Sequence, residues 1–70
     1  MEKFNEILIV LRGNKTQLEV AREIGISVSA IGMYESGKRV PRDHIKRKLA
    51  EYYGKSVEEI FFKKNVTICD

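Results

Sequence analysis

The apolar residues near the N-terminus recur at the spacing of one face of a helix. Positions i, i+3, i+4 and i+7 of one amphipathic stripe are filled by Phe4, Ile7, Leu8 and Leu11. The apolar run 7–11 is also consistent with a buried strand. The charged residues before it and Arg12 after it favour the helix, which we expect to end at Gly13-Asn14.

A second helix is predicted from its capping signals. Thr16 and Glu19 have the spacing of a capping box, in which each side chain bonds the other residue's backbone N–H. The inward face of this helix is predicted to be Val20, Ala21 and Ile24. Gly25 is placed to end the helix, and Ser27, two residues on, is a new N-cap. The two helices are therefore joined by a tight turn.

Three further elements follow the same logic. A third helix is predicted to begin at Ser27 and to end at Ser36-Gly37. A fourth helix is predicted to begin after Pro41, at Asp43, and to end at Gly54. A short fifth helix is predicted from the capping box of Ser56 and Glu59. Their predicted inward residues are Ile31, Tyr34, Ile45, Leu49, Tyr52, Tyr53, Val57, Ile60 and Phe61. Residues 65–69 alternate like a short strand, which is unstable alone and so is frayed, docked or paired with a partner chain.

The fold class predicted from this pattern is all-α: one compact five-helix domain over residues 1–63, followed by a strand-like tail at 64–70. The length of 70 residues allows one domain, which buries only about 60% of the surface of its unfolded chain. A hydrophobic share of 43% and a charged share of 33% are typical of a folded soluble domain. The chain contains no apolar run of membrane-span length and no secretory signal, so we expect a cytoplasmic protein.

The sequence contains no recognisable catalytic or metal-binding motif. The single cysteine, Cys69, excludes an internal disulfide framework, and the single histidine, His44, has no second ligand nearby in the sequence. There is no nucleophile–base set and no phosphate-binding loop. We therefore expect no enzymatic activity, no cofactor, no metal, no membrane partner and no small-molecule ligand.

Positive charge is concentrated in one window of the chain. Of 13 Lys and Arg residues, six lie between Ser36 and Lys48, where Asp43 is the only acidic residue. The window therefore carries 6 − 1 = +5, whereas the rest carries 7 − 9 = −2. The six are Lys38, Arg39, Arg42, Lys46, Arg47 and Lys48. Such a distribution indicates an acidic partner, nucleic acid first, although a solvated helix face is the alternative.

Two short helices joined by a glycine turn define a helix-turn-helix. Three residues at consistent spacing support this motif here. Ala21 is small enough to let the helices approach closely, Gly25 can adopt the left-handed conformation of the turn, and Ile31 fills the junction between the helices.

From Arg12 to Phe62 the chain resembles the phage-repressor-type (Cro/C1, XRE) helix-turn-helix family of bacterial and phage transcriptional regulators. The matching stretches are Leu11-Arg12, Thr16-Gln17, Val20-Ala21, Gly25-Ile26-Ser27, Ile31, Tyr34-Glu35-Ser36-Gly37-Lys38, Pro41 and Ser56-Val57-Glu58-Glu59-Ile60-Phe61. The resemblance implies a lambda-repressor-like DNA-binding domain whose helix 27–36 enters the major groove of double-stranded DNA.

The resemblance also implies roles for individual residues. Gln17 is expected to contact a phosphate at the start of its helix. The predicted DNA-backbone set is Gln17, Ser27, Ser36, Lys38, Arg39 and Arg42. Arg12 is the candidate ion-pair partner of Glu35. Many members of the family have a longer connection between this Arg and the Thr-Gln pair, so the resemblance leaves that ion pair open.

Helical geometry predicts which residues of 27–36 read bases. At 100° per residue, with Ile31 and Tyr34 facing inward, the outward face contains Val28, Ser29, Gly32 and Met33. This face has no Arg, Asn or Gln for bidentate base contacts. We expect Val28 and Met33 to contact thymine methyl groups, and Ser29 to bond a base edge. Gly32 is either tolerated or allows close approach of the helix backbone to DNA.

Two functions fit these features. The first is a transcriptional regulator, a repressor by expectation, that binds a palindromic operator as a homodimer through the tail and Phe61-Phe62. The second is a protein-interaction module of the same fold, antitoxin-like or antirepressor-binding. The exposed apolar residues of helix 27–36, together with Leu18, motivate the second.

Overall fold

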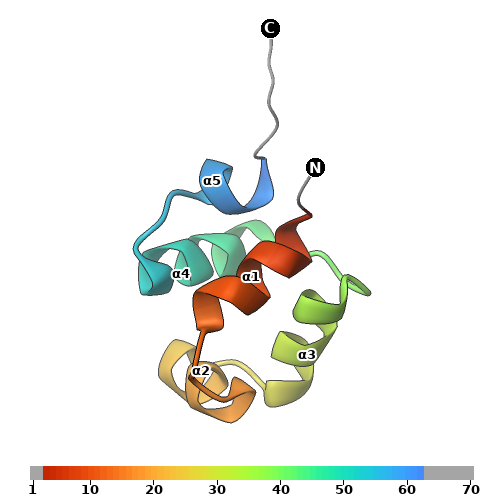
Figure 1. Cartoon of the computed structure of the whole chain (residues 1–70), viewed down its shortest axis with the longest axis vertical. Coiled ribbons are helices and arrows are strands. Elements are labelled where there is room, and N and C mark those ends of the chain that lie inside the picture. The colour runs from red at the N-terminus through yellow and green to blue at the C-terminus, as the bar shows by residue number, and fades with distance from the viewer. Residues whose placement is uncertain (1–2, 63–70) are drawn as a thin grey trace, which may run out of the picture.

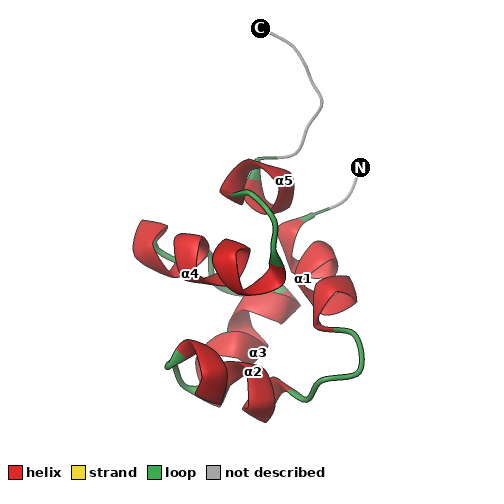
Figure 2. Cartoon of the chain, turned by 90° about the vertical axis from the view of Figure 1, so that its left-hand side faces the viewer, coloured by secondary structure: helices red, strands yellow, loops and turns green. Residues whose placement is uncertain are grey.

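Five short helices make up the regular structure of residues 3–62, which are the residues that the computed structural model describes. They are α1 (Phe4–Arg12), α2 (Gln17–Ile24), α3 (Val28–Ser36), α4 (Asp43–Tyr53) and α5 (Val57–Phe61). Between residues 3 and 62 the chain contains only helices, turns and loops (Figure 2). The all-α prediction is therefore confirmed, and the strand predicted at 65–69 lies outside the described residues.

The predicted N-caps form as the sequence indicates. In α2 the Thr16 hydroxyl accepts from the Glu19 backbone N–H at 3.0 Å, and the Glu19 carboxylate accepts from the Thr16 N–H at 2.9 Å. Ser56 and Glu59 make the same reciprocal pair at α5. The Ser27 hydroxyl accepts from the Ala30 N–H at 3.0 Å. Local hydrogen bonds thus satisfy the first backbone donors of three helices.

The helices pack around one hydrophobic core. α1 packs against α3 and α5, α2 against α3 and α4, and α4 against α5, so that α5 and α2 lie at opposite ends of the fold (Figure 1). The buried apolar residues are Leu8, Val20, Ala21, Ile31, Tyr34, Ile45, Leu49, Ala50 and Ile60. The rings of Phe4 and Phe61 lie 5.6 Å apart, which brings the two ends of the described chain together.

Two adjacent tyrosines close the side of the core formed by α4. Tyr52 donates a hydrogen bond to the Glu23 carboxylate and accepts one from Lys15 at 2.9 Å, so its hydroxyl lies in an exposed charged cluster. Tyr53 is half-buried, and burial, aided by the negative charge of Glu35, raises its pKa to about 12. The two neighbouring phenols therefore lie in very different environments.

Candidate nucleic-acid interface

The helix-turn-helix consists of α2, the turn at residues 25–27, and α3. Gly25 has φ +92°, and its N–H and that of Ile26 both donate to the Ala21 carbonyl, at 2.8 and 3.0 Å. Such a left-handed residue is tolerated best as glycine. Ala21 and Ile31 are each 2% exposed, and α2 packs directly on α3. Ala21, Gly25 and Ile31 therefore have the burial and backbone geometry that their predicted structural roles require, and the roles themselves stay predictions.

The outward face of α3 is exposed and uncharged. Val28 and Met33 are 43% and 40% exposed, Ser29 is also exposed, and Gly32 is half-buried. The opposite face is buried through Ile31 and Tyr34 in the core. The four predicted base-reading residues thus share the side of α3 that faces away from the core, and their role in base reading stays a prediction.

The chain reverses direction tightly after α3 and returns to it. Gly37 has φ +80°, and the carbonyl of Met33 accepts from the N–H groups of Lys38 at 3.0 Å and Arg39 at 3.4 Å. The Lys38 bond, with that from Gly37 to Tyr34, is a Schellman motif. It fixes the backbone of the first two basic residues directly beside the C-terminal end of the exposed helix.

The basic window divides into separate groups. Lys38, Arg39 and Arg42 are exposed, and none of them forms an ion pair within residues 3–62. Arg39 and Arg42 line one open hollow that reaches Tyr34. The Lys46 ammonium lies instead over the rings of Phe61 and Phe62, 5.5 and 4.8 Å from their centres. Lys38, Arg39 and Arg42 are therefore the basic residues near α3, whereas Lys46 contacts α5.

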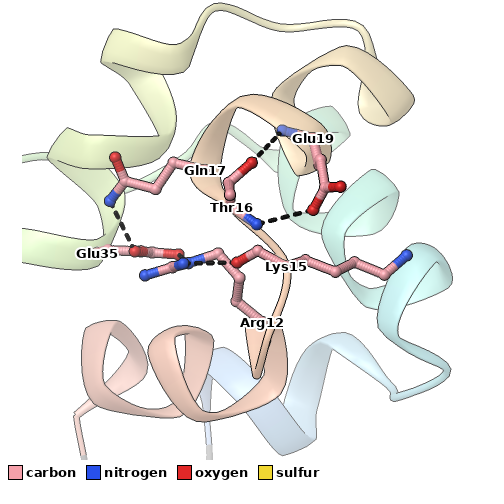
Figure 3. A network of polar contacts seen from close by, with 6 residues as sticks. All are labelled: Arg12, Lys15, Thr16, Gln17, Glu19 and Glu35. Atoms are coloured by element: carbon pink, nitrogen blue, oxygen red, sulfur yellow. Dashed lines mark hydrogen bonds and ion pairs between the residues drawn. The ribbon is translucent and has the colours of Figure 1, made fainter.

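A partly buried ion pair connects α1 to α3 beside this surface. The Arg12 Nε lies 2.8 Å from the Glu35 carboxylate, whose side chain is 6% exposed (Figure 3). The hydrogen bond to Glu35 raises the pKa of Arg12 above its usual value. Arg12 also donates to the Lys15 carbonyl at 2.7 Å. The pair that the resemblance left open therefore forms, despite the short connection between α1 and α2.

The structure distinguishes the three uncharged residues of the predicted DNA-backbone set by their hydrogen bonds. The Ser27 hydroxyl oxygen accepts from Ala30, so its proton stays available to a phosphate oxygen. The Ser36 hydroxyl already donates to the Met33 carbonyl at 3.1 Å. It would have to break this bond in order to donate to a phosphate. Gln17 donates to Glu35 at 2.9 Å.

Sequence reasoning missed two contacts at this surface. One is the bond from Gln17 to Glu35. The other is the packing of Asn5 against the turn after α3, where a Cβ on Gly37 would lie 3.4 Å from the Asn5 side chain. Glu35 lies on the inward side of its helix, which signals a need for polar partners. Nothing in the sequence pattern singles out Asn5.

Residues 3–62 contain neither a membrane-spanning helix nor a cluster of metal-ligating side chains. No helix there is long and apolar enough to cross a membrane. The same residues contain no group of three or more His, Cys, Asp or Glu side chains that could hold a metal ion.

Comparison with known proteins agrees with this geometry. The family model described as Helix-turn-helix matches residues 8–60. Among solved structures, the chain is similar to the solution structure of the SOS-response transcriptional repressor LexA from Eubacterium rectale. The TM-score is 0.80 and the identity 28%, over 100% of this chain and 83% of that one. No curated protein matches significantly. The chain belongs to the Cro/C1-type (XRE) helix-turn-helix family of DNA-binding transcription regulators.

Proposed function

We propose that this regulator is a repressor that binds a palindromic operator in double-stranded DNA as a homodimer, with α3 in the major groove. The observation that carries the proposal is the exposed, uncharged face of α3 beside the exposed Lys38 and Arg39. An uncharged, partly apolar helix face can contact base edges in the major groove, and basic side chains beside that face can contact the phosphates along the groove. Similarity to a structure named as a transcriptional repressor supports the direction of regulation.

In this proposal base reading depends mainly on apolar contacts. Val28 and Met33 contact thymine methyl groups, Ser29 bonds a base edge, and Gly32 allows the α3 backbone to approach the DNA closely. Ser27, Lys38, Arg39 and Arg42 contact phosphates. Because no bidentate base contact is available from α3, phosphate contacts supply much of the affinity, and DNA shape supplies part of the specificity.

The phosphate contacts are tested by salt dependence. The plot of log K against log salt concentration should have a steep slope, and Lys38→Gln or Arg39→Gln should each reduce it by about one. Lys55→Gln removes an equally exposed charge from the connection between α4 and α5 and is the matched control. Equal slopes for all four proteins would contradict a backbone role for Lys38 and Arg39.

The homodimer is proposed to form through α5 and the tail at 64–70. Phe62, which directly follows α5, is 55% exposed, so a large apolar side chain is available there to a partner chain. Sedimentation at operator-saturating concentration should give a dimer on DNA, and Phe62→Ser should weaken it. A monomer with and without DNA would exclude this assembly.

Selection from a random double-stranded library at physiological salt tests the function as a whole. Enrichment of an inverted repeat, with half-site centres about 10 bp apart or a multiple of that, is expected for a dimeric operator-binding protein. Retention of DNA without any motif would mean non-specific phosphate binding. If the protein retains no DNA from the library, the proposal that it binds an operator is wrong.

A protein-interaction module is the second candidate. It is favoured by exposed apolar side chains on α1 and α2 that DNA reading does not require: Val10 is 77% exposed and Leu18 52%. Lys38→Glu combined with Arg39→Glu discriminates the two functions. The double variant should lose operator binding if DNA is the partner. It should still bind its partner protein if α1 and α2 form a protein-binding surface.

A further inference from the structure

Glu35 is a buried carboxylate with both oxygens occupied by donors from other segments. Its Oε2 accepts from the Arg12 Nε at 2.8 Å, and its Oε1 accepts from the Gln17 Nε2 at 2.9 Å. A carboxylate that is 6% exposed is costly unless it is paired in this way. One side chain of α3 therefore holds the end of α1 and the first residue of α2 (Figure 3).

The bond to Glu35 determines which way the Gln17 carboxamide points. Because a carboxylate only accepts, the amide nitrogen must face Glu35. The amide oxygen then lies over α3 at Gly32, 3.7 Å from where a Cβ on that residue would be. A long side chain at position 32 would compete for this space. Glu35 on one side and Gly32 on the other thus restrict the Gln17 rotamer.

The backbone end of Gln17 is held by the same network. Arg12 reaches past Glu35 to the carbonyl of Lys15, the residue before the N-cap Thr16. Gln17 follows the cap directly. Both the origin and the tip of the Gln17 side chain are therefore fixed relative to α3 before any ligand arrives.

We propose that Glu35 is a positioning residue for DNA binding: it holds one amide proton of Gln17 so that the second N–H is presented to a phosphate oxygen. This rests on the proposed function. Within residues 3–62 the Gln17 side chain forms no other hydrogen bond. Ordering Gln17 in advance removes the entropy cost of immobilising a flexible side chain on binding, and Gly32 contributes by leaving the carboxamide its space.

Binding affinity alone does not test this role. The negative charge of Glu35 repels phosphates, so its removal strengthens DNA binding in general, whereas the loss of an ordered Gln17 weakens one contact. A glutamine at position 35 places an NH2 donor where Glu35 has one of its two accepting oxygens, so it cannot accept from Arg12 and Gln17 at the two positions that they bond in wild type. The informative quantity is the sensitivity of binding to individual phosphates.

The experiment replaces each operator phosphate in turn by an uncharged methylphosphonate and measures Kd for four proteins. Wild type should lose about tenfold in affinity at the phosphate that Gln17 contacts. Gln17→Met should lose this sensitivity at that phosphate alone, and Glu35→Gln should lose most of it there while keeping it at the Lys38 and Arg39 phosphates. Glu51→Gln, which removes an exposed charge from α4, should behave as wild type.

Four results would overturn the proposal. Retained sensitivity in Glu35→Gln would mean that Gln17 needs no positioning, and a uniform loss at all phosphates would mean a structural role only. Sensitivity unchanged in Gln17→Met would mean that Gln17 contacts no phosphate. Wild type that binds no DNA would reject the proposed function itself, a result distinct from the other three.

A measurement on wild type covers the case in which Glu35→Gln does not fold. In the free protein, the Gln17 side-chain amide proton that bonds Glu35 should resonate downfield of an ordinary glutamine amide proton and exchange more slowly with water. On the operator, replacing the contacted phosphate should shift one resonance and leave the Glu35-bonded one in place. Ordinary shifts for both protons in the free protein, or equal movement of both on the modified operator, would contradict the proposal.

Discussion

Two glycines in the helix-turn-helix illustrate how differently single residues act at this surface. Gly25 has φ +92°, which strains any residue with a Cβ, although the space around it is open. Gly32 has ordinary helical geometry, and an added Cβ would make normal van der Waals contact with the Gln17 oxygen. The left-handed backbone at position 25 therefore favours glycine, whereas the helical backbone at position 32 would accept other residues as well.

The two glycines predict opposite effects on stability when replaced by alanine. Gly32→Ala should raise the free energy of unfolding by about 0.5–1 kcal/mol, because alanine loses less conformational entropy in a helix. Gly25→Ala should lower it by about 1–2 kcal/mol through left-handed strain. Urea unfolding measures both. A loss of stability in Gly32→Ala would show that the space beside Gln17 is tighter than the distance indicates.

Val28 and Met33 make a testable prediction about base recognition. If they contact thymine methyl groups, replacing a contacted thymine by uracil should weaken wild-type binding several-fold, since only the methyl is removed. Val28→Ala should reduce this difference at the positions that Val28 reads. Ser29→Ala, on the same face, should leave the thymine–uracil difference unchanged. Equal binding to both operators by wild type would exclude methyl contacts.

At the scale of elements, α5 depends most on its surroundings. It has five residues, fewer than an isolated helix needs to be stable in water. Its support comes from the capping box of Ser56 and from Ile60, which is 1% exposed in the core. The ammonium of Lys46 above Phe61 adds a cation–π contact from α4.

The capping box of α5 can therefore be tested apart from DNA contacts. Ser56→Ala should lower the free energy of unfolding by about 1 kcal/mol, because the Glu59 N–H loses its acceptor. Operator affinity under conditions where the variant is fully folded should not change. Ser29→Ala serves again as a control, now for the loss of an exposed hydroxyl that caps no helix. An equal loss in both variants would mean that the capping bond adds no stability.

The elements were predictable because their signals are local. Thr16 with Glu19, Ser56 with Glu59, and the glycines after the helices lie within a few residues of the ends that they define. The pairing of Arg12 with Glu35 was indicated only by resemblance, because it joins residues far apart in the sequence. The bond from Gln17 to Glu35 was not predicted, since it depends on how closely α2 approaches α3 once both have packed.

At the scale of the whole molecule, the sequence shows how many charged residues a segment has, but not which side of the fold each of them faces. The basic window from Ser36 to Lys48 runs through a turn and along α4, so its side chains face different surroundings. Lys38 and Arg39 lie beside α3, whereas Lys46 lies over α5. A window charge of +5 therefore overstates what α3 alone can present to a phosphate backbone.

The stability of the whole fold should depend on alkaline pH through Tyr53. Its pKa is about 12 in the folded protein against 10.0 for an unperturbed tyrosine, so the unfolded chain loses this proton first. The contribution of Tyr53 to stability is then fully present below pH 10 and is lost as pH rises towards 12. Chemical denaturation across this range should show a smaller decrease for Tyr53→Phe than for wild type. Equal decreases would mean that Tyr53 titrates normally when folded.

The contact between Phe4 and Phe61 has a consequence for the chain before it folds. These rings meet across almost the whole described sequence, so the unfolded chain has to close a long loop to form this contact. A covalent bridge between neighbours of the two residues would remove that freedom from the unfolded ensemble while requiring little movement of α1 or α5. The fold thus already holds Phe4 and Phe61 close together, as a ring closure between these two segments would require.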